Sequence, residues 1–449
     1  MICQISRWKE LWQWLPTDGD AGLSALPDTV PLGDILSRIQ TPIDKTTITL
    51  DELNVIAKIT FGGELHLRPS AQKIGYKGPL FRADSGDLII SKIRVSQGSL
   101  CIVPPELDYV AVSNEYPVYR PDLSQVDSAF LSLLLRTEQF QCALQSLRSG
   151  NTTKARLRPV DFEALPIPLP DPADQRNLVD AYQNSALKAA ELEAQALRIE
   201  RDAQLEFEAD LGLSPPPNLP KRPFQIARFK EIERWSHEGI LQTALLGDAP
   251  PESKYEIVPL GDIATVSYGL QKCPANRPDK HPRPYLRVAN VQRGYLDLRK
   301  IKTINVPDAD MTKYRLEDGD VLLCEGNSAD LVGRGAIWQN EIADCVHQNH
   351  VLRVRLERQR AIPEFILAYI NSPSGQAYFR SKAKRTTNLA SINSKEVGNL
   401  PVPLPDDTAT QVAILLGLKN GQQTAASIRK QAEGIRTSAW KDFIAAVFT

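Results

Sequence analysis

The hexapeptide VPLGDI occurs at residues 30–35 and is repeated without change at residues 258–263. Two further segments recur in the same order, SGDLII at 85–90 as DGDVLL at 318–323 and PIPLP at 166–170 as PVPLP at 401–405. The first pair lies 228 residues apart and the last pair 235. Solenoid and propeller units are much shorter, roughly 20 to 50 residues. The spacing therefore predicts duplication of a whole domain together with its connector.

The composition is that of a folded protein of two to four domains. The 449 residues are 42% hydrophobic and 24% charged, and the 33 prolines and 25 glycines follow no collagen-like period,. The apolar runs are far shorter than the roughly 20 residues needed to cross a bilayer. Residues 1–14 carry no long apolar segment, so we expect a cytoplasmic protein,. The six cysteines form no CxxC pair, which predicts reduced thiols,.

Each repeat is predicted to begin with a mixed α/β head. Gly-Asp turns precede apolar runs at 88–93 and 321–324, and partly alternating segments follow at 109–118 and 346–356. Both patterns are typical of strands. Helical apolar spacing then covers 130–147 and 363–380. A polar loop and a proline-rich hinge are expected to end each head.

A long helix is predicted after each hinge. In the first copy, Asp171 can cap the helix, Pro172 fits its first turn, and Gly212 can end it,. Gly417, Gly421 and Gly434 each weaken the second helix by roughly 1 kcal/mol relative to alanine,. Apolar residues spaced alternately by four and three form a coiled-coil seam on each helix. These seam residues are Leu178, Tyr182, Ala189, Leu192, Ala196, Ile199, Ala203, Leu418, Ala425, Ile428, Ala432, Ile435 and Ala439.

These patterns predict an α+β fold in which the two long helices pack together as an antiparallel coiled coil, with the repeats related by a pseudo-twofold axis. The alternative is that each helix packs onto its own head. The expected divisions are an N-terminal segment at 1–29, a first head at 30–170, a first helix at 171–213, a linker at 214–255, a second head at 256–405 and a second helix at 406–449.

The sequence contains no phosphate-binding loop, zinc-binding HExxH helix, nucleophile elbow or amino-methyltransferase motif,. Asp87 lacks the second acid of a nuclease motif, and Asp320 is interpreted as a turn residue. Cys345, His347 and His350 lack a partner pair with zinc-type spacing,. We therefore predict no catalytic residue, no metal and no cofactor held by this chain.

The sequence does contain basic and polar segments of the kind that bind nucleic acid. The net charge of −1 neither requires nor excludes a nucleic-acid partner,. Residues 271–302 hold nine lysines and arginines against two aspartates, and polar, basic loops precede both hinges. Such cations bind phosphates, and interspersed polar side chains can read base edges. The predicted DNA-binding residues are Lys73, Tyr76, Lys92, Arg94, Arg148, Asn151, Thr152, Lys154, Arg156, Arg158, Lys272, Arg277, Lys280, Arg283, Tyr285, Arg287, Asn290, Asn327, Arg334, Lys382, Lys384, Arg385 and Asn388.

Over nearly its whole length the chain resembles the DNA-specificity subunit (S subunit) of type I restriction-modification systems. In that family each half begins with a V-P-L-G-[DE] turn, as at Val30 and Val258. Each half closes with an apolar-Pro-x-Pro segment, an acid-Gln pair and a long helix. Residues 165–175 have this pattern with Asp174 as the acid, and residues 400–411 have it with Thr410 in place of the acid.

The resemblance implies that each head is a target-recognition domain that reads one half of a split, asymmetric site in double-stranded DNA, while the helices act as a ruler for the gap. It also implies a non-catalytic subunit that binds two methyltransferase (M) subunits, which hold S-adenosylmethionine, and restriction/translocase (R) subunits, with no membrane partner. Two other interpretations stay open. One is a self-contained Mg-dependent nuclease with an unrecognised active site. The other is a specificity factor of another phage-defence assembly, or a scaffold that binds only proteins.

Overall fold

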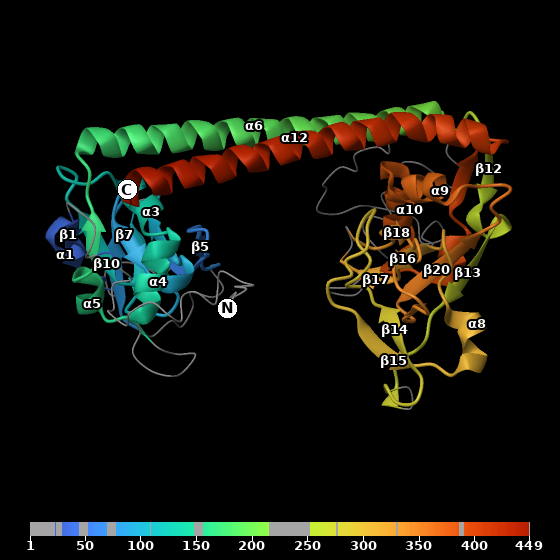
Figure 1. The fold of residues 1–449 in the computed structure, drawn as a ribbon, viewed down its shortest axis with the longest axis horizontal. Coiled ribbons are helices and arrows are strands. Elements are labelled where there is room, and N and C mark those ends of the chain that lie inside the picture. The colour runs from blue at the N-terminus through green and yellow to red at the C-terminus, as the bar shows by residue number, and fades with distance from the viewer. Residues whose placement is uncertain are drawn as a thin grey trace, which may run out of the picture. The chain divides into compact units, whose positions relative to one another are not determined.

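The computed structural model describes residues 23, 29–44, 53–69, 78–107, 109–147, 156–214, 252–274, 277–328, 331–385 and 390–448, apart from the side chains of Asn327 and Arg385. By its internal contacts the chain divides into two units, Met1–Leu192 with Gln431–Thr449, and Glu193–Lys430. Each unit contains one head and a part of each of two long helices (Figure 1). The predicted N-terminal segment and linker lie mostly outside the described residues.

The described residues of the first unit form three sheets. β2-β10-β7-β8 is antiparallel, β3-β6-β9-β4-β5 is mixed because β4 and β9 run parallel, and β1 pairs with β11. The elements are β1 (Thr29–Pro31), α1 (Leu32–Ile35), β2 (Leu36–Ile39), β3 (Thr41–Pro42), β4 (Asn54–Ile59), β5 (Leu65–Leu67), β6 (Leu80–Ala83), β7 (Leu88–Ile90), η3 (Val95–Gln97), β8 (Leu100–Ile102), β9 (Val110–Ser113), β10 (Val118–Pro121), α3 (Ser128–Leu134), α4 (Glu138–Ser146), α5 (Pro159–Glu163), β11 (Pro166–Pro168) and the start of α6 (Pro172–Asp210).

The second unit repeats the central plan, with β13-β20-β16-β18 and β12-β23 in place of β2-β10-β7-β8 and β1-β11. It adds the sheets β15-β14-β19 and β17-β22-β21. The elements are β12 (Glu256–Pro259), η5 (Leu260–Asp262), β13 (Ala264–Tyr268), β14 (Pro282–Leu286), β15 (Lys302–Asn305), η7 (Asp308–Asp310), α8 (Met311–Tyr314), β16 (Val321–Cys324), β17 (Gly326–Asn327), β18 (Gly335–Ile337), β19 (Val346–His347), β20 (Val351–Leu356), α9 (Pro363–Asn371), α10 (Pro373–Lys382), β21 (Lys384–Arg385), β22 (Ala390–Ser391), α11 (Ser394–Gly398), β23 (Pro401–Leu404) and the start of α12 (Thr408–Phe448).

The repeated hexapeptide and the repeated proline-rich segment pair with each other in both heads. Val30 lies opposite Ile167, and Val258 lies opposite Val402, in two-stranded antiparallel sheets. The proline-rich segments were predicted as hinges, and this prediction is wrong because they are strands. Proline cannot donate a hydrogen bond to a ladder, so it is confined to edge strands, and both strands of a two-stranded sheet are edges. The pairing joins the beginning of each head to its end.

Each helix predicted within a head is in fact two helices, α3 and α4 in the first unit and α9 and α10 in the second. In the second unit the break occurs at Ser372, whose hydroxyl accepts a hydrogen bond from the Gly375 amide (3.3 Å), with Pro373 in the first turn of α10. Capping side chains and proline start a new helix at such a point. Apolar periodicity continues across the break, which is why the sequence pattern shows one helix.

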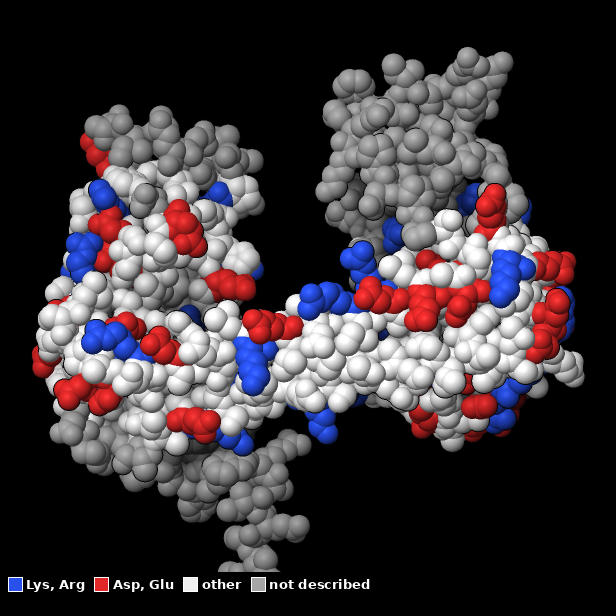
Figure 2. Space-filling view, turned by 90° about the horizontal axis from the view of Figure 1, so that it is seen from above, with Lys and Arg blue, Asp and Glu red and all other residues white. Residues whose placement is uncertain are grey.

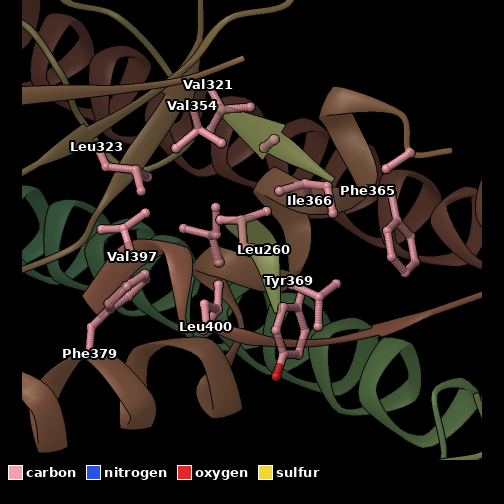
Figure 3. Close-up of a cluster of buried hydrophobic side chains, with 14 of the residues drawn as sticks. Leu260, Val321, Leu323, Val354, Phe365, Ile366, Tyr369, Phe379, Val397 and Leu400 are labelled. Atoms are coloured by element: carbon pink, nitrogen blue, oxygen red, sulfur yellow. The ribbon is translucent and has the colours of Figure 1, made fainter. Parts of the chain in front are cut away.

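The core of the second head lies between its central sheet and its helices. Figure 3 shows Val321 and Leu323 of β16 and Val354 of β20 gathered with side chains of the neighbouring helices. All belong to one cluster of buried residues. Full burial of each such side chain stabilises the fold by about 1.5–3 kcal/mol. Tyr369 completes this core and donates its hydroxyl to the Pro401 carbonyl of β23 (2.7 Å). The repeated β23 segment is thereby fixed to α9.

The two long helices pack against each other in both units. In the first unit the Tyr182 ring of α6 lies 5.8 Å from that of Trp440 and 6.3 Å from that of Phe443, both on α12. In the second unit Gly421 of α12 lies against Ala203 of α6. The early part of each helix thus meets the late part of the other, so they run antiparallel (Figure 1). This confirms the predicted fold class and contradicts the alternative in which each helix packs only onto its own head.

The predicted seam residues all turn away from solvent to some degree. Ala189, Ala196, Ala425 and Ala432 are fully buried, and none of the other predicted seam residues is exposed. Small side chains let two helix backbones approach closely, so the alanine-rich seam explains the tight pair. Among the described residues, no helix is long and apolar enough to span a bilayer.

Candidate nucleic-acid interface

Three segments of the second unit that were predicted to bind DNA meet at one place, around Glu325. The Glu325 amide donates to the His350 carbonyl (3.0 Å), and the Ile392 amide donates to the Glu325 carbonyl (2.9 Å). β17 continues from Glu325 and pairs with β22, which pairs with β21 at Lys384. The loop that leads to Lys272 joins the same place, because the Leu270 amide donates to the His347 carbonyl (2.8 Å).

Several predicted cations of these segments are exposed. Lys272, Arg277 and Lys280 lie in the loop between β13 and β14, and Lys384 lies in β21. None of these four forms an ion pair with an acid among the described residues. Lys382 is half-buried at the end of α10. Asn388 and the side chains of Asn327 and Arg385 lie outside the described part of the chain.

Other arginines of the basic segment are held by the protein itself. Arg283 donates to Asp344 (2.9 Å) and to Asp308 (2.5 Å), and Arg287 donates to the Lys300 carbonyl (2.8 Å). The hydrogen bond from Arg315 lowers the pKa of the Asp344 carboxyl and keeps it charged. Figure 2 shows the same intermixing of basic and acidic side chains on the side of each unit that carries the long helices. The basic segment is therefore less positive than its lysines and arginines suggest.

Three predicted DNA-binding residues lie in the interior of the second head. Tyr285 is 3% exposed and packs in an apolar cluster that includes Ile304 and Val346. Asn290 is 2% exposed and holds a turn by accepting from the Arg287 amide (3.0 Å). Arg334 is 8% exposed and donates to the Val288 carbonyl (3.3 Å). These three side chains serve packing and turn geometry, and we leave them out of the candidate interface.

The first unit brings its described candidates together in the same way. The Lys92 amide donates to the Glu115 carbonyl (3.1 Å), and the Leu157 amide donates to the Lys92 carbonyl (2.9 Å). The Arg156 guanidinium donates through Nε and Nη2 to the two oxygens of the Glu115 carboxylate (3.1 and 3.2 Å). Arg94 is exposed on the turn that follows Lys92. These residues form a small charged surface. Because they are far apart along the chain, the sequence did not show that they meet.

The remaining DNA-binding candidates of the first unit either are not part of this charged surface or fall outside the described residues. Arg158 donates through two nitrogens to Asp161 at the start of α5 (both 2.7 Å). Sequence analysis did not place Glu115 and Glu325 beside the candidate residues, because a lone acid after a strand carries no DNA-binding signal. Lys73, Tyr76, Arg148, Asn151, Thr152 and Lys154 lie outside the described residues.

The residues weighed as a metal site do not converge. His347 is buried, and its Nδ1 is 2.7 Å from the Val351 carbonyl oxygen. Burial lowers the pKa of His347 to about 4 and raises that of Cys345 to about 12. His350 instead lies with Nδ1 2.6 Å from the Glu325 carboxylate. Within the described ranges, no three metal-ligating side chains come together.

The aspartates at the Gly-Asp turns form ion pairs with arginines of neighbouring strands. Arg355 of β20 donates to both oxygens of Asp320 (2.8 and 2.7 Å), and Arg120 of β10 does the same for Asp87 (2.9 and 3.0 Å). Both acids are almost fully buried. In the second unit, Asp320 and Arg355 line a polar cleft of about 790 Å³. Asp320 also accepts from the Glu317 amide (2.7 Å), so it serves a turn, as predicted, and Asp87 does the same by accepting from the Asp84 amide (2.9 Å).

The fold defines a class of protein with two duplicated α/β heads and two antiparallel connecting helices. No protein-family model matches the chain. It is 27% identical over 220 residues to the putative type I restriction enzyme MjaX specificity subunit of Methanocaldococcus jannaschii, which covers 49% of this chain and 50% of that protein. It is 22% identical over 343 residues to the type I restriction enzyme EcoKI specificity subunit of Escherichia coli strain K12, which covers 76% of this chain and 67% of that protein. These alignments span half to two thirds of the relatives' length.

The chain also matches a solved structure described as "Structural basis underlying complex assembly and conformational transition of the type I R-M system". The match has a TM-score of 0.55 and 18% identity and covers 94% of this chain and 97% of that chain. At this identity it shows the fold alone. In sequence the chain is similar to type I restriction enzyme specificity subunits, and its fold is similar to that of the solved type I R-M structure.

Proposed function

We propose that this protein is the sequence-specific DNA-binding subunit of a type I restriction-modification complex. Each head reads one half of a bipartite, asymmetric site in double-stranded DNA. The proposal is supported most directly by the internal repeat: two heads share one scaffold, while their described surface loops carry different charged and polar side chains. One scaffold with two unlike surfaces suits the recognition of two different half-sites, because base contacts specify sequence and the scaffold only positions them.

The proposal assigns the long helices two roles. They set the number of base pairs between the half-sites, and they dock two methyltransferase subunits. Those partner subunits bind S-adenosylmethionine and extrude the target adenine from the duplex. The restriction/translocase subunits join the same complex. This chain itself holds no cofactor and carries out no chemistry, and we expect it in the cytoplasm.

Selection from a randomised DNA duplex tests this function. The full chain is co-expressed with type I methyltransferase subunits, and bound duplexes are recovered and sequenced. We expect a motif of two unlike half-sites with a spacer of fixed length and free sequence. Recovery of duplexes without any shared motif would contradict the proposal. Cleavage of DNA by the isolated chain with Mg²⁺ alone would instead establish the nuclease interpretation.

A further inference from the structure

The two heads share a junction of three backbone segments that is built by the same hydrogen bonds. In the first head, residue 92 donates to the carbonyl of residue 115 and accepts from the amide of residue 157. In the second head, residue 325 donates to the carbonyl of residue 350 and accepts from the amide of residue 392. The four distances lie between 2.9 and 3.1 Å. These six positions are therefore equivalent in the duplicated scaffold.

The side chains at these equivalent positions differ in charge. The first head has Lys92 where the second has Glu325, and Glu115 where the second has His350. Arg156, one residue before Leu157, corresponds to Ser391. The first junction thus carries an arginine held by a glutamate, and the second carries a histidine beside a glutamate. The backbone is kept and the exposed chemistry is changed, as expected where two domains of one origin bind different ligands.

Arg156 has the geometry of a group that reads a base edge. A guanidinium has five N–H donors in a planar fork. Nε–H and one Nη2–H point to Glu115, which leaves the Nη1–Nη2 edge for a second planar, bidentate acceptor. The Arg156 side chain is 55% exposed and that of Glu115 is 44% exposed, so this edge is reachable. The major-groove edge of guanine, with N7 and O6, is such an acceptor.

Glu115 favours base reading over phosphate binding. Its negative charge offsets that of Arg156 and reduces the long-range attraction to the DNA backbone. It also fixes the guanidinium plane before DNA arrives, so less side-chain entropy is lost on binding. Exposed cations such as Lys272 and Lys280 have no such partner among the described residues, as suits phosphate contacts.

We propose that Arg156, held in place by Glu115, reads a guanine in the half-site of the first head. The second head lacks this contact because Ser391 stands in place of Arg156 and His350 in place of Glu115. The proposal rests on the proposed function and names the side chain that distinguishes the two half-sites. Arg156 is a specificity-determining residue, and Glu115 is its positioning residue.

The test is the duplex selection described above, repeated with Arg156→Lys and Glu115→Gln in the full chain with its methyltransferase partners. Arg156→Lys keeps the charge but loses the fork, so one G·C position of one half-site should lose about 5- to 100-fold in discrimination. The other half-site and the salt dependence should not change. Glu115→Gln should loosen the same position while affinity for random DNA does not fall, because a negative charge has been removed.

Arg120→Lys is the matched control. Arg120 is an exposed arginine on β10 of the same head that is likewise held through two nitrogens by a carboxylate, that of Asp87. Its variant should select the wild-type motif. An unchanged motif with Arg156→Lys would overturn the assignment alone, and so would equal weakening at every position, which is the signature of a phosphate contact. If the wild-type complex selects no motif, the proposed function is refuted, and the role assigned to Arg156 is refuted with it.

Discussion

Gln175 fixes the start of α6 to the first head. Its side chain is fully buried, Oε1 accepts from the Asp127 amide (2.8 Å), and Nε2 donates to the carbonyls of Pro170 (2.7 Å) and Gln125 (2.9 Å). The sequence shows this residue only as the second member of an acid-Gln pair. Its role could not be predicted, because Gln125 and Asp127 lie in a loop about 50 residues earlier that periodicity does not locate.

Gln411 makes the equivalent contacts in the second unit and supports a direct prediction. Its Oε1 accepts from the Ile362 amide (3.0 Å), and its Nε2 donates to the Arg360 (2.9 Å) and Pro405 (3.3 Å) carbonyls. Gln411→Leu leaves these buried groups unpaired, so the free energy of unfolding should fall by about 2–4 kcal/mol. Urea denaturation measures the loss. Gln423→Leu, on the exposed side of α12, is the control and should change stability by less than about 0.5 kcal/mol,.

His347 makes the second unit sensitive to acid. Burial lowers its pKa to about 4 from an ordinary value of about 6.5,. Between these values the unfolded chain binds a proton that the folded chain does not, so stability is present above about pH 6.5 and falls as the pH drops towards 4. From pH 7.5 to pH 5 the loss should be about 2 kcal/mol.

Hydrogen exchange of residues 346–356 at the two pH values measures this loss. His347→Asn keeps an N–H that can reach the Val351 carbonyl but does not titrate, so its exchange should depend less on pH. Equal pH dependence in both proteins would show that another group is responsible.

At the scale of elements, the long helices were predicted better than the heads. Their seam follows from side-chain spacing along one helix, which is local information. The heads depend on pairing between distant segments, so the proline-rich strands were mistaken for hinges. For the same reason, the sequence did not reveal that Tyr285 and Asn290 are buried, since they lie in a segment rich in proline and arginine.

Gly421 is the seam residue that the sequence analysis counted only as a helix-weakening glycine. A Cβ atom at this position would lie 2.4 Å from the Ala203 Cβ of α6. Gly421→Ala should therefore destabilise the second unit by about 0.5–2 kcal/mol, because overpacking costs more than the roughly 1 kcal/mol that alanine gains in helix propensity. Thermal unfolding measures the change.

Gly417 and Gly434 are matched controls on the same helix. A Cβ at either position meets nothing within 4 Å. Gly417→Ala and Gly434→Ala should each stabilise the protein by about 0.5–1 kcal/mol. Stabilisation by all three substitutions would mean that the helices do not approach closely at Gly421 in solution.

At the scale of the whole molecule, the net charge is near zero, but the cations fall into two groups, those paired with acids and those without an acidic partner among the described residues. Many arginines are held by acids of the same unit, whereas Lys272, Lys280 and Lys384 are exposed and form no ion pair with a described acid. Replacing these three by alanine should weaken binding to all sequences alike. The slope of log K against log salt concentration should become shallower by about 0.9 for each DNA phosphate that the variant no longer neutralises. An unchanged slope in a salt titration would show that these lysines do not touch the DNA backbone.

The antiparallel helix pair leads to a prediction about spacing. Insertion of one heptad after Leu192 in α6 and one after Lys430 in α12 preserves the seam, because each insertion restores the side-chain register,. Seven residues lengthen a helix by about 10.5 Å, and one turn of DNA covers about 34 Å in about 10 base pairs. The spacer in the selected motif should therefore grow by about three base pairs while both half-sites stay the same. A heptad in α6 alone breaks the seam and should abolish selection, and an unchanged spacer in the double insertion would refute the role of the helices as a ruler.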